Sequence, residues 1–262
     1  MAPSERSSAA FEHWLAHLEA RHLRDMTTSE VARALRALSS TYVERRARLS
    51  DRGAFDTAGK RAAYALYYAP RRFLTITHVL ASVGAPALPL SIVDVGCGTG
   101  AAGAAWALHA GAGSHVLAVD VHPWALEETR TTLRDFGLQG QTRRLAAGAA
   151  TALWKEGRSR REGPPGTGIV LSYVVNELAA EERTALLTAV MEAARHGARV
   201  LVMEPLSRRT SPWWNGWVET FVAAGGRADE WRLRLDPPPI TAALGVASGL
   251  DAVAATGRTL WL

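Results

Sequence analysis

Three glycines at alternate positions, Gly96, Gly98 and Gly100, follow a short β-branched run that contains Asp94. The apolar run before the glycines and the alanine-rich stretch 101–110 after them predict a buried strand, a tight turn and a helix. Glycine has no Cβ that would keep a ligand from the backbone. The helix N-terminus behind the turn presents free N–H groups. The pattern therefore predicts a turn that binds a nucleotide-like or carboxylate-bearing small molecule.

The spacing of the glycines indicates which class of ligand the turn could bind. Dinucleotide-binding turns have the pattern G-x-G-x-x-G, with the third glycine inside the helix, whereas the pattern here is G-x-G-x-G. No G-K-[ST] follows, which argues against a phosphate-binding loop. The alternative without a ligand is a plain turn between a strand and a helix in another α/β protein.

A second acid lies at the end of the next apolar run. Residues 115–120 predict a strand that ends at Asp120, about 20 residues after the glycine turn. A carboxylate at this place can accept hydrogen bonds from both hydroxyls of a ribose. It could also cap the helix that is expected to start near Pro123. Val121 and His122 follow where the edge of an adenine would lie.

The Asp-x-Gly-x-Gly-x-Gly pattern resembles motif I of the class I S-adenosylmethionine-dependent methyltransferases. The resemblance implies an α/β fold, namely a Rossmann-like seven-stranded methyltransferase sheet, here with an N-terminal helical extension. It implies S-adenosyl-L-methionine as the cofactor. The residues that it assigns to cofactor binding are Asp94, Gly96, Cys97, Gly98 and Gly100 at the methionine end, Asp120 at the ribose and Val121 next to it.

The rest of the chain fits this fold class. Strands are expected at 90–95, 115–120, 141–146, 169–175, 198–203, 228–235 and 256–261, and they alternate with helices, as in a parallel sheet. In this superfamily the last two strands form an antiparallel pair. Residues 11–84 read as helices, with Pro70 expected to end the third. We expect an N-terminal helical subdomain at 1–84, a cofactor-binding domain at 85–262, and a mobile charged loop at 158–168.

Polar residues follow the fourth expected strand, at the sheet edge where α/β proteins bind ligands. Tyr173 and Asn176 are therefore candidates to face the transferred methyl group, although Asn176 could equally anchor a loop. The Asn-Pro-Pro-aromatic motif of amino-methylating relatives is absent. Aromatic side chains that could contact a substrate, or pack in the core instead, are Tyr67, Tyr68, Trp213 and Trp214.

A narrower resemblance rests on the order of four segments: 63–73 with its tyrosines and Pro70, the glycine motif, 172–178, and Val202-Met203-Glu204-Pro205. Together they are similar to the small-ribosomal-subunit methyltransferase-like family of mitochondria and bacteria, over roughly residues 60–225. The resemblance implies ribosomal RNA or the small ribosomal subunit as the partner.

The chain departs from that family at three places. Tyr68 stands where the family usually has an arginine before the proline. The family's cysteine-rich segment, thought to hold an iron–sulfur cluster, is missing, since Cys97 is the only cysteine. Ala146-Ala147-Gly148-Ala149 replaces an acid that contacts adenine, which implies that backbone and apolar contacts hold the adenine here.

Composition limits the remaining classes. The 262 residues, of which 48% are hydrophobic, suffice for one sizeable core. The net charge of +5 is compatible with an RNA partner, although arginine supplies nearly all of it, as in a GC-rich genome. One cysteine excludes disulfides and cysteine-based metal sites within the chain, and we expect no metal. No apolar run is long enough for a membrane helix. We expect that residues 1–10 are not a signal peptide and that the protein is cytoplasmic.

The sequence leaves three functions open. The first is a methyltransferase that acts on ribosomal RNA or a ribosome precursor. The second is a methyltransferase for a small planar metabolite, which the tryptophans and the missing cysteines favour. The third is a non-catalytic ribosome assembly factor that retains the fold, since no general base stands out.

Overall fold

A seven-stranded sheet lies at the centre of the protein, in a computed structural model that describes residues 5–44, 55–88, 90–153, 166–207 and 211–262. The strand order is β3-β2-β1-β4-β5-β7-β6. The first five strands in this order, β3, β2, β1, β4 and β5, are parallel to their neighbours. Strand β7 is antiparallel to both β5 and β6. The Rossmann-like methyltransferase sheet expected from the sequence is confirmed. The strands are β1 Leu90–Val95, β2 His115–Asp120, β3 Gln139–Arg144, β4 Gly166–Ser172, β5 Arg199–Glu204, β6 Arg227–Arg234 and β7 Ala254–Trp261.

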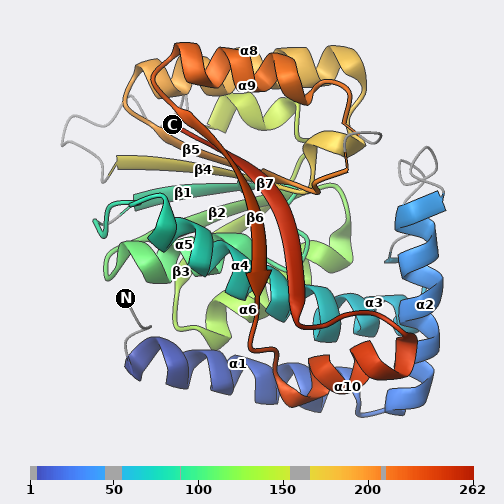
Figure 1. Ribbon diagram of the computed structural model, residues 1–262. Helices are drawn as coiled ribbons and strands as arrows, with labels where there is room; N and C mark the ends of the chain where they lie inside the picture. Colours follow the sequence, from blue (N-terminus) through green and yellow to red (C-terminus); the bar gives the residue numbers. More distant parts are fainter. Residues whose placement is uncertain (1–4, 45–54, 89, 154–165, 208–210) are drawn as a thin grey trace.

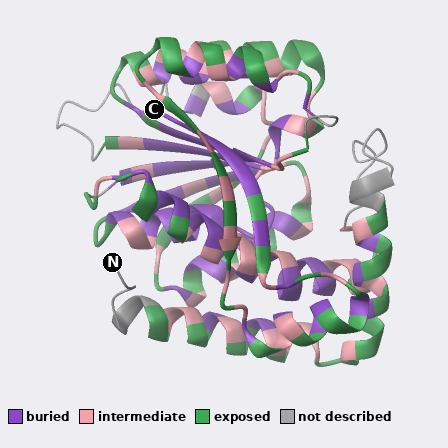
Figure 2. Cartoon of the chain, in the orientation of Figure 1, coloured by how far each residue is buried: buried purple, intermediate pink, exposed green. Residues whose placement is uncertain are grey.

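Helices cover both faces of the sheet (Figure 1). One face carries α8 (Ala180–Arg195), α9 (Trp214–Ala223) and the short η4 (Ala149–Ala152); their buried side chains form one apolar cluster with the sheet. The larger cluster, on the other face, includes the N-terminal helices. Figure 2 shows buried strands between helices with exposed outer sides. The helices of this second layer are α1 Glu5–His22, α2 Thr28–Glu44, α3 Ala58–Ala63, α4 Ala69–Ser82, α5 Ala101–Ala110, α6 Pro123–Asp135 and α10 Pro239–Ser248.

The strand boundaries differ from the expected ones at two places. Strand β3 begins two residues before the expected start, because this exposed edge strand is polar and gives little hydrophobic signal. Strand β4 ends at Ser172 and not at residue 175. Tyr173 has a φ of 62° and Val175–Glu177 form a 3₁₀ turn, η6, so the chain leaves the sheet earlier than its apolar sequence predicts.

One further expectation concerns a segment that is described only in part. Of the charged loop expected at 158–168, residues 166–168 belong to β4 and the remainder lies outside the described residues. In the described part of the chain, no helix combines the length and the apolar character needed to cross a membrane.

The expected break at Pro70 does not occur. Helix α3 continues into α4 through a π-helical turn, η3 (Tyr64–Tyr68), in which the N–H of Ala69 donates to the carbonyl of Tyr64. A proline inside an α-helix removes one hydrogen bond and clashes with the carbonyl four residues earlier, here that of Leu66. The wider turn accommodates Pro70, and the Leu66 carbonyl accepts a hydrogen bond from the Thr241 hydroxyl of α10 at 2.8 Å.

The N-terminal helix α1 is fixed to α6 by buried polar contacts. Trp14 Nε1 donates to Thr132 Oγ1 at 3.3 Å, and Arg21 Nη2 lies 2.6 Å from Glu128 Oε1. Burial raises the pKa of Glu128, but the hydrogen bonds and charges of His22 and Arg21 outweigh it and lower the pKa on balance. Residues of the predicted helical subdomain therefore pack in the same apolar cluster as the cofactor-binding domain. The boundary at residues 84 and 85 stays a prediction.

The contact between Thr241 and Leu66 leads to a prediction about stability. Thr241→Val keeps the shape of this fully buried side chain but leaves the Leu66 carbonyl without its donor. We expect a loss of about 1–3 kcal/mol in the free energy of unfolding, measured by urea titration. Thr241→Ser retains the hydroxyl and should lose less. A valine variant as stable as the parent would contradict this account of the π turn.

Candidate functional site

The glycine turn lies against the end of β2, which fixes its path. The N–H groups of Gly96 and Cys97 both donate to the Val119 carbonyl, at 2.9 and 3.0 Å. Gly98 has a φ of 56°, and a Cβ there would lie 2.9 Å from the Tyr64 hydroxyl. A Cβ on Gly96, whose φ is 67°, would lie 2.4 Å from a methyl group of Val174. Glycine is required at both positions, because conformation and space each exclude a side chain.

Asp120 connects the glycine turn with the loop that follows β2. Its Oδ2 accepts from the N–H of Gly98 at 3.0 Å and its Oδ1 from the N–H of His122 at 2.8 Å. Burial raises the pKa of the Asp120 carboxyl, and the two backbone hydrogen bonds oppose that shift. The cap of α6 is His122, whose Nδ1 accepts from the N–H of Trp124 at 3.2 Å. Asp120 is therefore placed at the turn and not at the helix cap.

Asp94 is completely buried and holds the first turn of α5. Its Oδ2 accepts from the N–H of Gly103 at 2.9 Å, and a Cβ on Gly103 would approach that oxygen to 2.8 Å. The other oxygen, Oδ1, has no hydrogen-bond partner among the described residues. Burial raises the pKa of Asp94 to about 7. The acid of the motif therefore fixes the helix behind the turn.

A cavity of about 320 Å³ opens beside the glycine turn. Gly96, Gly98 and Asp120 line one side, and the apolar residues 145–147 that follow β3 line another. Ser172, at the end of β4, is 3% exposed, and its Oγ has no partner among the described residues. A buried hydroxyl without a partner in a cavity wall indicates a place for a polar group of a ligand. The remaining lining residues are Phe55, Tyr64, Arg72, Val121, His122, Tyr173, Val174, Glu177, Leu178 and Glu182.

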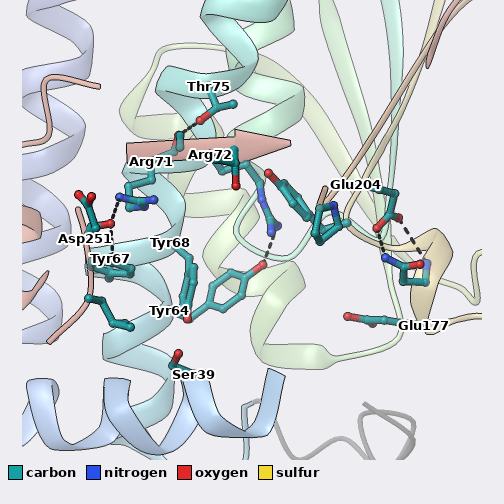
Figure 3. A pocket seen from close by; sticks show the side chains of 16 residues that line it. Ser39, Tyr64, Tyr67, Tyr68, Arg71, Arg72, Thr75, Glu177, Glu204 and Asp251 are labelled. Carbon is teal, nitrogen blue, oxygen red and sulfur yellow. Dashed lines mark hydrogen bonds between the residues drawn. The ribbon is translucent and has the colours of Figure 1, made fainter. Parts of the chain in front are cut away.

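A second cavity, of about 340 Å³, adjoins the first (Figure 3). Four residues line both cavities: Tyr64, Arg72, Tyr173 and Glu177. The second cavity draws its other walls from segments far apart in the sequence: Ser39 of α2, residues of η3 and α4, η6, the end of β5, and the residues before and at the start of β7. These other lining residues are Tyr67, Tyr68, Arg71, Thr75, Asn176, Glu204, Pro205, Leu250, Asp251, Ala255 and Thr256.

Arg72 lies between the two cavities. Its Nη1 donates to the Tyr64 hydroxyl at 2.7 Å, and its guanidinium lies 4.5 Å from the centre of the Tyr173 ring. Burial raises the pKa of Tyr64 and of Tyr173, while the charge of Arg72 opposes the shift in both. Both tyrosines therefore stay protonated at neutral pH. A left-handed backbone at a bulky residue such as Tyr173 is costly and is found mainly where a site requires it.

Asn176 is held by three hydrogen bonds. Its Nδ2 donates to Glu204 Oε2, while its Oδ1 accepts from Ser211 Oγ at 2.7 Å and from Trp213 Nε1 at 3.0 Å. Glu204 is completely buried, and its Oε1 accepts from the N–H groups of Val175 and Asn176. Asn176 lines the second cavity, and its bonds are those of a loop anchor, the alternative that the sequence left open. A catalytic part for it stays a prediction.

Of the other predicted site residues, some line a cavity and some do not. Tyr67 and Tyr68 line the second cavity, and burial raises the pKa of Tyr68 to about 12. Trp213 and Trp214 line neither cavity: Trp213 binds Asn176, and Trp214 is buried below the Arg258 guanidinium. The Cys97 side chain is buried beside Thr129, away from the cavity wall. Among the described residues, no three His, Cys, Asp or Glu side chains are grouped to hold a metal.

The sequence did not single out Arg72 or Ser172 as residues of the cavity walls, and it favoured capping or loop anchoring for Glu177, which lines both cavities. Ser172 and Glu177 flank the predicted Tyr173 and Asn176, so their position at the end of β4 was the available signal. Arg72 gave no such signal, because the expected break at Pro70 separated it from Tyr64.

The anchoring of Asn176 leads to a second prediction. Asn176→Ala removes three hydrogen bonds and leaves polar groups of Glu204, Ser211 and Trp213 without their partner. We expect the free energy of unfolding to fall by roughly 2–4 kcal/mol in a urea titration. The matched control is Asn215→Ala on the exposed side of α9, which should change it by less than about 0.5 kcal/mol. Equal free energies of unfolding for the two variants would show that the Asn176 hydrogen bonds do not stabilise the protein.

Solved structures with related folds include several methyltransferases. A SAM-dependent methyltransferase from Aquifex aeolicus is 15% identical, with a TM-score of 0.43 over 72% of this chain and 89% of that chain. Precorrin-6y C5,15-methyltransferase from Geobacter metallireducens is 12% identical, with a TM-score of 0.43 over 71% and 86%. A SAM-dependent O-methyltransferase from Thermotoga maritima is 14% identical, with a TM-score of 0.46 over 71% and 63%.

The comparison with protein families identifies a narrower relationship. No curated protein matches the sequence significantly. The family described as "Mitochondrial small ribosomal subunit Rsm22" matches residues 57–227, more than half of the chain. The match runs from the residue before α3 to the first residue of β6 and agrees with the segment expected from the four motifs. The chain therefore belongs to the Rsm22 family and has the fold of the class I S-adenosylmethionine-dependent methyltransferases.

Proposed function

We propose that this protein binds S-adenosylmethionine in the cavity beside the glycine turn and methylates ribosomal RNA or a precursor of the small ribosomal subunit. The observation that carries the proposal is the pair of adjoining cavities at the carboxyl ends of β1, β2 and β4, where α/β sheets bind ligands. The description of the family supports the ribosomal acceptor.

The residues of the first cavity fit the parts of the cofactor. Asp120 lies at the strand end where a carboxylate accepts from ribose hydroxyls. Leu145, Ala146 and Ala147 offer the apolar surface and backbone expected for an adenine. The side-chain-free turn at Gly96 and Gly98 leaves room for the methionine part, and the Ser172 hydroxyl lacks a partner that a polar ligand group would supply.

The chain's own contribution to the reaction is alignment and exclusion of water. S-adenosylmethionine supplies a methyl group that its sulfonium already activates. Holding an acceptor in line with that group and removing water provides much of the acceleration. Tyr64, Arg72 and Tyr173 form the wall between the two cavities, so they are placed to position both ligands. Asn176 and Glu204 hold the loop that carries Tyr173.

The tryptophans no longer support a small planar metabolite as the acceptor, because neither Trp213 nor Trp214 lines a cavity. The assembly-factor alternative is decided by experiment, since a non-catalytic protein could retain the same cavities.

The cofactor assignment is tested by calorimetric titration with S-adenosylmethionine and, separately, with NAD. We expect micromolar binding of the first and none of the second. Asp120→Ala removes the acceptor of the Gly98 N–H as well as the predicted ribose ligand, so we expect affinity to fall at least tenfold. The control Asp236→Ala, at an exposed aspartate, should bind like the parent. A parent protein that binds neither compound, or that binds NAD alone, would refute the cofactor assignment.

The acceptor is tested separately with the methyl-labelled cofactor. We expect label to enter RNA when the protein is incubated with small-subunit precursor particles or with RNA extracted from them. A protein that binds the cofactor but labels neither substrate would contradict the ribosomal acceptor and favour a non-catalytic assembly factor.

A further inference from the structure

The second cavity is walled by flat side chains. Tyr64, Tyr67, Tyr68 and Tyr173 all contribute to its lining, and the planar Arg72 guanidinium lies against the Tyr173 ring. Figure 3 shows Tyr64, Tyr67 and Tyr68 on one side of the cavity, with the Arg72 side chain directed toward the Tyr64 hydroxyl. Aromatic rings and guanidinium planes are the groups on which proteins stack flat heteroaromatic rings. The shape of the wall therefore favours a planar ligand.

The polar groups of the cavity include both donors and acceptors. Hydroxyls come from Ser39, Tyr68 and Thr256, and carboxylates come from Glu177 and Asp251. The edge of a nucleobase presents donors and acceptors next to each other, whereas a simple phenol presents one hydroxyl. The cavity's volume of about 340 Å³ lies at the lower end of the range for small-molecule sites. A ligand with one ring system and a mixed polar edge matches these features.

The charges of the cavity argue against a phosphate group inside it. Two arginines line it, but so do three acids, Glu177, Glu204 and Asp251. Arg71 donates from Nη1 to the Asp251 carbonyl at 2.8 Å and from Nη2 to the Ala254 carbonyl at 2.7 Å, so its guanidinium binds the chain where it enters β7. Carboxylates repel a phosphate group, and both arginines already bind groups of the protein. The interior therefore suits the ring of a nucleoside and leaves its phosphates outside.

We propose that the second cavity binds a nucleobase, from a free nucleoside or from an unpaired RNA residue turned out of its stack, next to the cofactor cavity. The proposal rests on the methyl transfer proposed above and names its acceptor. In that transfer the acceptor atom of the ring gains the methyl carbon and loses its proton to water, while the electrons of the broken carbon–sulfur bond remain on sulfur. A flipped base is read in this way, by stacking and by hydrogen bonds to its edge.

The test fills the second cavity without touching the first. Thr256 lines the second cavity only and is exposed, so Thr256→Trp can add an indole there without disturbing the core. The matched control is Thr188→Trp on the exposed side of α8, which lines neither cavity. Calorimetry with S-adenosylhomocysteine reports on the first cavity. Titration of the S-adenosylhomocysteine-loaded protein with the four ribonucleosides, and with a single-stranded RNA of mixed sequence, reports on the second.

We expect all three proteins to bind S-adenosylhomocysteine within about twofold of one another. We expect Thr256→Trp alone to weaken binding of at least one nucleoside, or of the RNA, by tenfold or more. Nucleoside binding that is insensitive to salt would identify a free nucleoside as the source, and RNA binding that falls steeply with salt would identify RNA.

Two results would overturn the nucleobase proposal while leaving the cofactor site intact. One is a loaded parent protein that binds neither nucleosides nor RNA, and the other is undiminished binding by Thr256→Trp. Failure of the parent to bind S-adenosylhomocysteine would instead refute the proposed function itself.

Discussion

Carboxylates at strand ends hold the loops from which both cavities are built. Asp94 of β1 accepts from Gly103, Asp120 of β2 accepts from Gly98 and His122, and Glu204 of β5 accepts from Val175 and Asn176. Loops at the edge of a parallel sheet leave backbone N–H groups without ladder partners, and a buried N–H must find an acceptor. An acid on a rigid strand supplies that acceptor at a fixed place. The positions of Gly98 and Tyr173 follow from this constraint.

The same constraint explains why part of the site could be predicted. The apolar runs that end at β1 and β2 and the glycines between them are local in sequence, and β1 and β2 have the expected bounds. Asp120 was expected at the end of its strand, about 20 residues after the glycine turn, and in the structure its carboxylate accepts from the Gly98 N–H of that turn. The predicted position of β3 differs by two residues from the observed one, because this exposed, polar edge strand lacks the alternation of apolar residues that marks a strand.

The remaining features depend on contacts between distant segments. Tyr173 adopts a left-handed backbone where its sequence continues an apolar strand, and its N–H donates to the Met203 carbonyl of β5. Nothing near Tyr173 in the sequence indicates this turn. Trp214 is buried and Trp213 is half-buried, and the directions of their side chains depend on contacts with Arg258 and Asn176, which are distant in the sequence. Arg72 was not predicted as a site residue, because a proline is expected to end an α-helix and so to separate Arg72 from Tyr64. The π-helical turn η3 instead lets the helix continue past Pro70.

The π turn also determines which side of α4 faces the sheet. Each residue of an α-helix turns the next by about 100°, so one extra residue in a turn rotates everything after it by that angle. Pro70 and the residues that follow, Arg71 and Arg72 among them, owe their orientation to η3. Deleting one residue between Tyr64 and Tyr68 would bring Pro70 into a regular α-helical turn, and it would turn the Arg72 guanidinium away from Tyr64 and Tyr173. A change in chain length by one residue, well before the glycine motif in the sequence, would thus change the architecture of the site without altering any strand of the sheet.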